Sequence, residues 1–201
     1  MKTARVEAFS DAVFAVAITL LVLGIRIPAT NGSLIGALAD QWPAFAAFAI
    51  SFLVIGIVWV NHHTLFHLLL YTDRTLLFIN LGLLMAIVLI PFVTALFAGY
   101  VATGGSEASV AAALYNASML LMGAAFQASV VWVGRHHELL RERLEPLTRR
   151  QQLRYGVGPL AYLACIPLAF ANPVAVLIID ALVAVYYIFD QAEVKHVDAP
   201  A

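Results

Sequence analysis

One long apolar stretch with an acid near its start sets the strongest limit on how this chain folds. Residues 5–27 read RVEAFSDAVFAVAITLLVLGIRI, and Thr19 is the only polar side chain between Ala12 and Ile25. About 20 residues at a rise of roughly 1.5 Å cross a hydrocarbon core of about 30 Å. The stretch therefore predicts a membrane-spanning helix. Asp11 near its start is costly in lipid, and such an acid normally has a partner or a task.

The composition of the whole chain agrees with a membrane location. The 201 residues are 63% hydrophobic and 11% charged, with a mean hydropathy of +0.92, whereas soluble domains are about 25% charged. The single cysteine, Cys165, excludes an intramolecular disulfide and a cysteine-based metal cluster. Lys2 and Arg5 before an apolar run are also typical of a signal peptide. Asp11, the lack of a small-x-small cleavage site and the later spans predict instead that this helix is retained.

Hydropathy and break signals predict an all-α integral membrane fold with six transmembrane helices in one domain, residues 1–201. A Pro-Asn-Gly loop, Gly104-Gly105 and Asn172-Pro173 separate the apolar runs. Pro91 should kink the third span, because proline removes a backbone hydrogen bond. The expected spans are 6–27, 43–66, 74–100, 107–133, 153–170 and 174–189, with a charged connector at 135–153.

The basic residues predict the orientation of these spans. Of the 11 Lys and Arg residues, only Arg26 falls on one side of the six-span order. The positive-inside rule then predicts that both termini and the Arg-rich connector are cytoplasmic. Adding or removing one span would mix the two groups, which supports the count of six.

With this orientation, polar side chains of several spans fall at one depth. Ser10 and Asp11 lie about one and a half turns from the cytoplasmic end of the first span. The side chains expected at the same depth on other spans are Trp59, His62, His63, Asn80 and Gln127. A buried carboxylate needs hydrogen-bond donors. We therefore expect Asp11 and Ser10 to bond to the indole and to one of the two histidines, with the asparagine as a further candidate.

A helical wheel of the first span separates this polar patch from an apolar stripe. Asp11 points to nearly the opposite side from the stripe, and Ser10 points sideways. The stripe begins at Arg5 and continues through Ala12, Val16, Thr19, Leu20 and Leu23. From the residues alone, three partners for the stripe remain open: lipid, a neighbouring helix or a pore.

The motif Arg5-x-x-x-Phe9-Ser10-Asp11 followed by AVFAVAITLLVL closely resembles the RxxxFSD signature helix of the transmembrane protein 175 family. The resemblance continues more weakly through residues 59–63 (WVNHH) and 91–94 (PFVT), and the last third of the chain is similar mainly in hydropathy. Members of this family are potassium-permeable channels without the TVGYG filter. The resemblance implies a structural motif network formed by Arg5, Phe9, Ser10, Asp11, Trp59, His62, His63 and Asn80.

The resemblance also implies an assembly and a path for ions. A chain with a single motif resembles the prokaryotic members, which are homotetramers of the inner membrane with their first helices around a central pore. The equivalent positions of the pore constriction are Val16, Leu20 and Leu23, and Thr19 and Ala12 are further candidates for the pore lining. Many relatives carry Ile or Leu where this chain has Val16, so we expect a wider inner ring. The expected partners are potassium ions, the lipid bilayer and copies of the chain, with no nucleic acid and no cofactor.

Two other classes of function are open. A secondary or proton-coupled transporter would use Asp180, which lies in the middle of the sixth span, together with Asp11. A haem or metal protein would use the histidines at 62, 63 and 67, but no HExxH motif and no second histidine pair within a span accompany them. The sequence shows no Ser-His-Asp arrangement, phosphate-binding loop or nucleotide motif, and we therefore expect no enzyme.

Overall fold

The computed structural model describes residues 3–28, 32–101, 103–141 and 149–191, except for the side chains of 149–155 and 190–191. Within these residues the structure is helical apart from loops and one isolated bridge between Leu69 and Leu140. The helices are α1 (Thr3–Leu20), the 3₁₀ turn η1 (Leu21–Gly24), α2 (Leu34–Ala39), α3 (Trp42–His67), α4 (Arg74–Tyr100), α5 (Gly105–Arg135), the 3₁₀ turn η2 (His137–Leu139), α6 (Arg149–Leu168) and α7 (Pro173–Gln191). The all-α fold expected from the sequence is confirmed.

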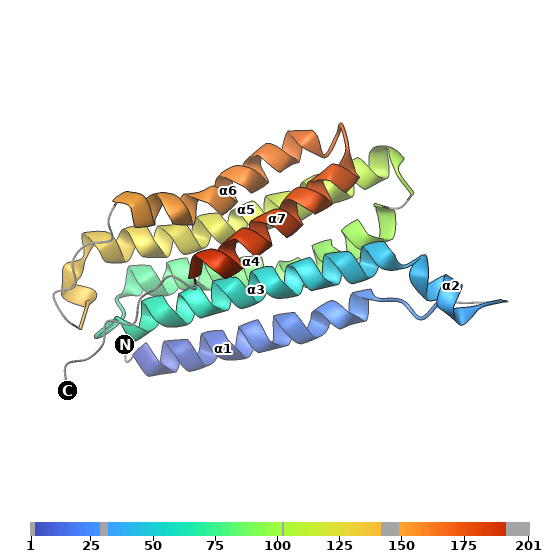
Figure 1. Ribbon diagram of the computed structural model, residues 1–201. Helices are drawn as coiled ribbons and strands as arrows, with labels where there is room; N and C mark the ends of the chain where they lie inside the picture. Colours follow the sequence, from blue (N-terminus) through green and yellow to red (C-terminus); the bar gives the residue numbers. More distant parts are fainter. Residues whose placement is uncertain (1–2, 29–31, 102, 142–148, 192–201) are drawn as a thin grey trace.

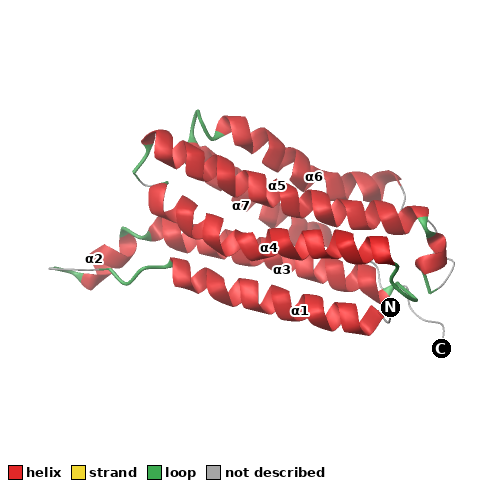
Figure 2. Cartoon of the chain, turned by 180° about the vertical axis from the view of Figure 1, so that it is seen from behind, coloured by secondary structure: helices red, strands yellow, loops and turns green. Residues whose placement is uncertain are grey.

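The six longer helices run side by side in one bundle, and the short α2 projects from one end of it (Figure 1). Helix α1 packs on α3 and α4, and α5 packs on both α4 and α6. Helix α7 contacts α3, α5 and α6, and lies on the side of α3 away from α1 (Figures 1 and 2). One face of α1 is therefore left uncovered within the protomer.

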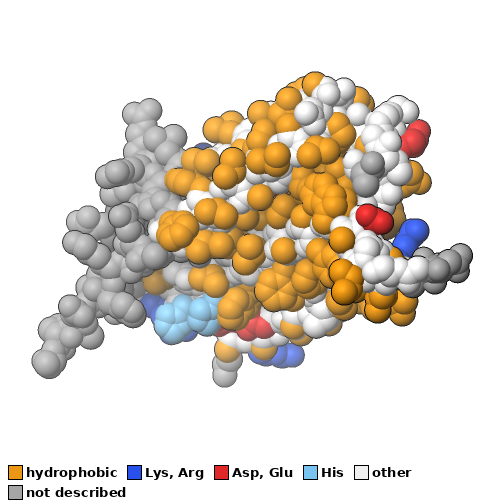
Figure 3. Space-filling model, turned by 45° about the vertical axis from the view of Figure 1, so that its right-hand side comes forward, with side chains coloured by type: hydrophobic (Ala, Val, Ile, Leu, Met, Phe, Trp, Pro, Cys, Tyr) orange, Lys and Arg blue, Asp and Glu red, His pale blue; other side chains and the backbone are white. Residues whose placement is uncertain are grey.

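Four helical segments among the described residues are long and apolar enough to cross a membrane: Thr3–Gly24, Trp42–His67, Arg74–Tyr100 and Gly105–Arg135. Two shorter apolar segments, Gly156–Leu168 and Pro173–Phe189, follow them. Hydrophobic side chains cover most of the face drawn in Figure 3. A surface of this kind suits contact with lipid rather than water.

The helix boundaries differ from the expected spans mainly around the first loop. Helix α4 covers the expected range, and α3, α5, α6 and α7 begin and end within a few residues of theirs. The first span instead ends at Gly24 after a 3₁₀ turn, where a Cβ on this glycine would lie 3.1 Å from Ala95 Cβ. Helix α2 was not expected, because six residues are too few for a hydropathy signal. Its N-cap is Ser33, whose Oγ accepts from the Gly36 N–H at 3.3 Å.

Polar contacts at the helix ends fix α4 and the connector that follows α5. Asp73 caps α4 by accepting from the Leu76 N–H at 2.8 Å, and its second oxygen accepts from Trp132 Nε1 of α5 at 3.1 Å. The start of the connector pairs with the α3–α4 loop, since the Leu70 N–H donates to the Leu139 carbonyl at 2.7 Å. Pro91 lies inside α4, which is helical on both sides of it.

A close helix contact between α5 and α6 gives a first prediction. A Cβ placed on Gly123 of α5 would lie 2.9 Å from Pro159 Cγ, whereas one placed on Gly82 of α4 meets nothing within 4 Å. We expect Gly123→Ala to destabilise the protein by about 1–3 kcal/mol, because the ring of Pro159 has little freedom to move. Gly82→Ala is the matched control, and we expect it to be neutral or slightly stabilising. Thermal unfolding in detergent measures both. Equal stability of the two variants would contradict the close contact.

Candidate functional site

Helix α1 has two faces with different surroundings. The buried face follows a spacing of three or four residues and faces α3 and α4; it consists of Val6, Ser10, Phe14, Ala17 and Leu21. This spacing is that of one face of an α-helix. The side chains that the sequence assigned to the apolar stripe lie elsewhere on the helix. The protomer thus holds α1 by one face only.

The apolar stripe is exposed along its whole length. Val16 is 56% exposed, Leu20 40% and Leu23 74%, and Ala12 and Thr19 are exposed as well. The Thr19 hydroxyl donates to the carbonyl of Val16 at 2.8 Å, so its proton is used within the helix. Arg5 and Phe9 of the motif are also exposed, Phe9 by 55%.

A buried chain of hydrogen bonds joins α1 to α4 and α3. Asn80 Nδ2 donates to Ser10 Oγ at 3.0 Å, and Ser10 donates to its own Val6 carbonyl at 2.9 Å. His62 Nε2 lies 2.9 Å from Asn80 Oδ1. An amide oxygen can only accept, so Nε2 of the histidine carries the proton. Ser10 and His62 are fully buried and Asn80 is 2% exposed; Ser10 therefore reaches the histidine through the asparagine and not directly.

The ring of His62 is held from both sides by aromatic side chains. Its centroid lies 4.1 Å from that of Phe66 in a stacked arrangement and 5.4 Å from that of Phe14 on α1. The contact with Phe14 adds an apolar link between α1 and α3 at the depth of the polar chain.

A second pair of contacts joins α1 to α3 alone. Trp59 Nε1 donates to Asp11 Oδ1 at 2.9 Å, and His63 Nδ1 lies 2.7 Å from Glu7 Oε1. Glu7 was not among the expected residues. The signal was present in the spacing, because Glu7 and Asp11 are four residues apart on α1, and Trp59 and His63 are four apart on α3, so two antiparallel helices align both pairs.

Two other expected polar residues lie outside these contacts. Gln127 is on α5, and its Oε1 is buried without a hydrogen-bond partner in the described part of the chain. Asp180 of α7 is 1% exposed and accepts from Asn116 Nδ2 of α5 at 3.2 Å. The two carboxylates of the transporter hypothesis, Asp11 and Asp180, thus contact different helix pairs.

A further buried polar cluster, unexpected from the sequence, joins α3, α4 and α5. Thr94 Oγ1 donates to the Ile90 carbonyl at 2.7 Å, so Ser51, 2.8 Å away, donates to Thr94. Tyr115 OH, 3.0 Å from Ser51 Oγ, must then donate to it. This cluster fixes the helices on which α1 rests.

The histidines of α3 do not gather a metal site within the residues that the structure describes. No group of three or more His, Cys, Asp or Glu side chains is arranged there to hold an ion. His63 and His67 stack with a centroid distance of 6.0 Å. His62 faces Asn80 and His63 faces Glu7, so the two neighbouring histidines serve different contacts.

The fold and these contacts define a multi-pass α-helical membrane protein whose first helix is bonded to its own protomer by one face and bare on the other. Comparison with known proteins gives the family. Residues 5–91 match the model of the endosomal/lysosomal potassium channel TMEM175. The chain is 42% identical to a potassium channel of Streptomyces collinus, over 100% of this chain and 98% of that protein. The chain belongs to the TMEM175 family.

A second relative and a solved structure agree with this assignment. A potassium channel of Chamaesiphon minutus is 37% identical over 85% of this chain and 86% of that protein. The crystal structure of a lysosomal potassium-selective channel TMEM175 homologue from Chamaesiphon minutus superposes with a TM-score of 0.81 and 34% identity. The superposition covers 94% of this chain and 97% of that one. The resemblance inferred from the RxxxFSD motif is confirmed.

The buried serine of the motif gives a prediction with an internal control. Ser10 and Ser129 are both buried and both donate to the carbonyl four residues earlier, but only Ser10 also accepts from another helix. We expect Ser10→Ala to lower the free energy of unfolding by about 1 kcal/mol, the usual size of such a bond between membrane helices. Ser129→Ala should be close to neutral. Thermal unfolding of the two purified variants tests this, and equal losses would contradict a role for the Asn80 bond.

Proposed function

We propose that this chain forms a potassium-permeable cation channel. Relatives that match nearly its whole length are named potassium channels, and a homologue of the same fold is described as potassium-selective. The chain has no TVGYG sequence that would build a filter of backbone carbonyls. Selectivity must then come from side chains or from the width of the path.

The proposed channel is a homotetramer with six membrane-spanning helices in each copy: α1, α3, α4, α5, α6 and α7. The observation that carries this proposal is the bare stripe of α1, because one stripe cannot enclose a path but several copies around an axis can. The opposite face of α1 makes the polar contacts with α3 and α4. Turning the stripe toward the axis therefore needs no break in the protomer.

In this assembly Val16, Leu20 and Leu23 form successive apolar rings along the path. Apolar rings gate by dewetting, and a wider state lets a partly hydrated ion pass. Potassium loses its hydration shell more readily than sodium, so a narrow apolar ring favours it. Thr19 lies between the rings, but its hydroxyl proton is used by the Val16 carbonyl, which leaves only its oxygen to face an ion.

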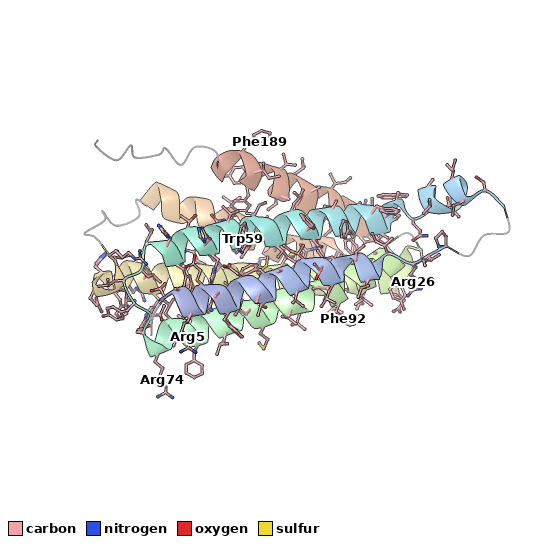
Figure 4. All side chains as sticks on the ribbon, turned by 90° about the horizontal axis from the view of Figure 1, so that it is seen from below. Arg5, Arg26, Trp59, Arg74, Phe92 and Phe189 are labelled. Atoms are coloured by element: carbon pink, nitrogen blue, oxygen red, sulfur yellow. The ribbon has the colours of Figure 1, made fainter. Side chains whose placement is uncertain are left out.

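The proposed location is the inner membrane of a prokaryotic cell, with both termini in the cytoplasm. Arg5 and Arg74 lie at one end of the bundle and Arg26 at the other (Figure 4). Arg135 is in the last turn of α5 and Arg141 follows η2, where Arg141 Nε donates to the Leu69 carbonyl of the α3–α4 loop. The basic end is thus the cytoplasmic one by the positive-inside rule.

Potassium flux into proteoliposomes tests the proposal. Leu20→Ala or Leu23→Ala should raise the flux and weaken the preference for potassium over sodium, because a wider ring dewets less readily. If each ring adds about 1 kcal/mol to the barrier, the flux rises roughly fivefold. Leu182→Ala on α7, a residue that is 62% exposed, is the matched control and should leave the flux unchanged. Equal effects of all three substitutions would refute the placement of α1 at the axis.

The same assay separates a channel from a carrier. Asp180→Asn keeps the size of the side chain and its ability to bond to Asn116, so a channel through the α1 path should keep its potassium flux. A carrier that depends on this carboxylate would lose transport.

The role of Asp11 gives a further prediction. Asp11→Ala removes the acceptor of Trp59 Nε1 and should reduce the yield and thermal stability of the assembled protein. Ion preference in the fraction that does assemble should stay close to that of the native chain. Asp40→Ala is the control, because Asp40 is exposed at the end of α2. Normal stability together with altered ion preference would place Asp11 in the ion path and contradict its structural role.

A further inference from the structure

Helix α2 lies beyond the ends of the helices that form the bundle. It follows the loop after α1 and leads into α3, and it projects outward from the end of the bundle (Figures 1 and 2). Arg26 lies at the same end, between α2 and the body of α1 (Figure 4). This end is the outer one in the proposed orientation.

The side chains of α2 are apolar and uncovered. The helix reads LIGALA, and none of its residues is buried. Ile35 is 81% exposed, Leu34 56% and Leu38 38%. A helix that is apolar on all sides is normally buried in protein or in a membrane. The protomer alone buries neither side of α2, so something outside the protomer must cover it.

The membrane surface is a poor cover for this helix. Helices that lie in the interface have one apolar and one charged or polar face, and α2 has no polar face. Polar residues also separate it from the apolar body of the bundle, because Arg26, Asp40 and Gln41 line one hollow at the outer ends of α3 and α4. Helix α3 is 26 residues long, about 39 Å, which already exceeds the hydrocarbon thickness of about 30 Å.

The apolar surface of α2 continues the bare stripe of α1. Leu23 near the end of the stripe is 74% exposed, and Ile27 in the loop that follows is 96% exposed. If copies of the chain meet along the stripe, the α1–α2 segment of each copy emerges next to those of its neighbours. The partner that the position of α2 favours is therefore a second copy of this chain.

We propose that α2 packs against the neighbouring copy at the outer end of the channel and holds the assembly together there. The inference rests on the proposed homotetramer and adds a contact to it that lies outside the membrane. The surface involved consists of Leu34, Ile35 and Leu38. Burying these side chains between copies removes them from water, a driving force that does not exist between helices inside lipid.

The test is the double substitution Ile35→Glu with Leu38→Glu, followed by the mass of the detergent-purified oligomer. We expect the tetramer to be lost in favour of smaller species, because four copies would bring eight carboxylates together. The control is Phe170→Glu, at the same outer end but after α6, where the native side chain is 63% exposed; it should keep the tetramer. Potassium flux of the native chain is measured separately, so a failure of the channel proposal would be seen independently of this result.

A labelling experiment covers the case in which the double variant does not fold. Ile35→Cys is made together with Cys165→Ala, which removes the only native cysteine, and is treated with a water-soluble maleimide. Protection in both detergent and bilayers, with labelling roughly tenfold faster after the oligomer is dissociated, supports the contact, since a covered thiol does not react. Equal labelling before and after dissociation overturns it and leaves α2 in water. Protection in bilayers alone also overturns it and assigns α2 to the membrane surface.

Discussion

The attachment of α1 through one polar face is the interaction on which the rest of the structure depends. Inside lipid no hydrophobic effect draws helices together, so close packing and hydrogen bonds decide which helices associate. Asp11 with Trp59, and Ser10 with Asn80, supply such bonds on one side of α1. Without them α1 would be an apolar helix with no preferred rotation. With them its stripe has one direction, and that direction leads out of the protomer.

The sequence predicted this arrangement to the level of depth and rotation, but not to the level of individual partners. The wheel of α1 and the order of the spans brought Asp11 and Ser10 to the depth of Trp59 and the two histidines. Which atoms pair depends on angles between helices that hydropathy does not contain. Asn80 thus stands between Ser10 and His62, and His63 reaches Glu7 instead of the motif.

Other parts of the structure could not be read from the pattern for different physical reasons. Helix α2 forms because Ser33 caps it, and a six-residue helix produces no periodic signal. The cluster of Ser51, Thr94 and Tyr115 comes from three different helices. Each of these residues alone is ordinary in a membrane helix, and only the packing of the bundle brings them together. Asp180 was visible as a buried acid, but its partner Asn116 lies 64 positions away.

The separation of the two faces of α1 has a consequence for conduction. Fourfold symmetry multiplies any side chain at the axis, so an acid there would become a ring of four carboxylates that binds cations strongly. Conduction requires binding weak enough for the ion to leave. Asp11 bonded to Trp59 is removed from the path, while Val16, Leu20 and Leu23 offer an ion no strong ligand. The same hydrogen bonds that hold α1 in the protomer therefore keep its one intramembrane charge away from the proposed route of the ion, and a half-turn of α1 would undo both at once.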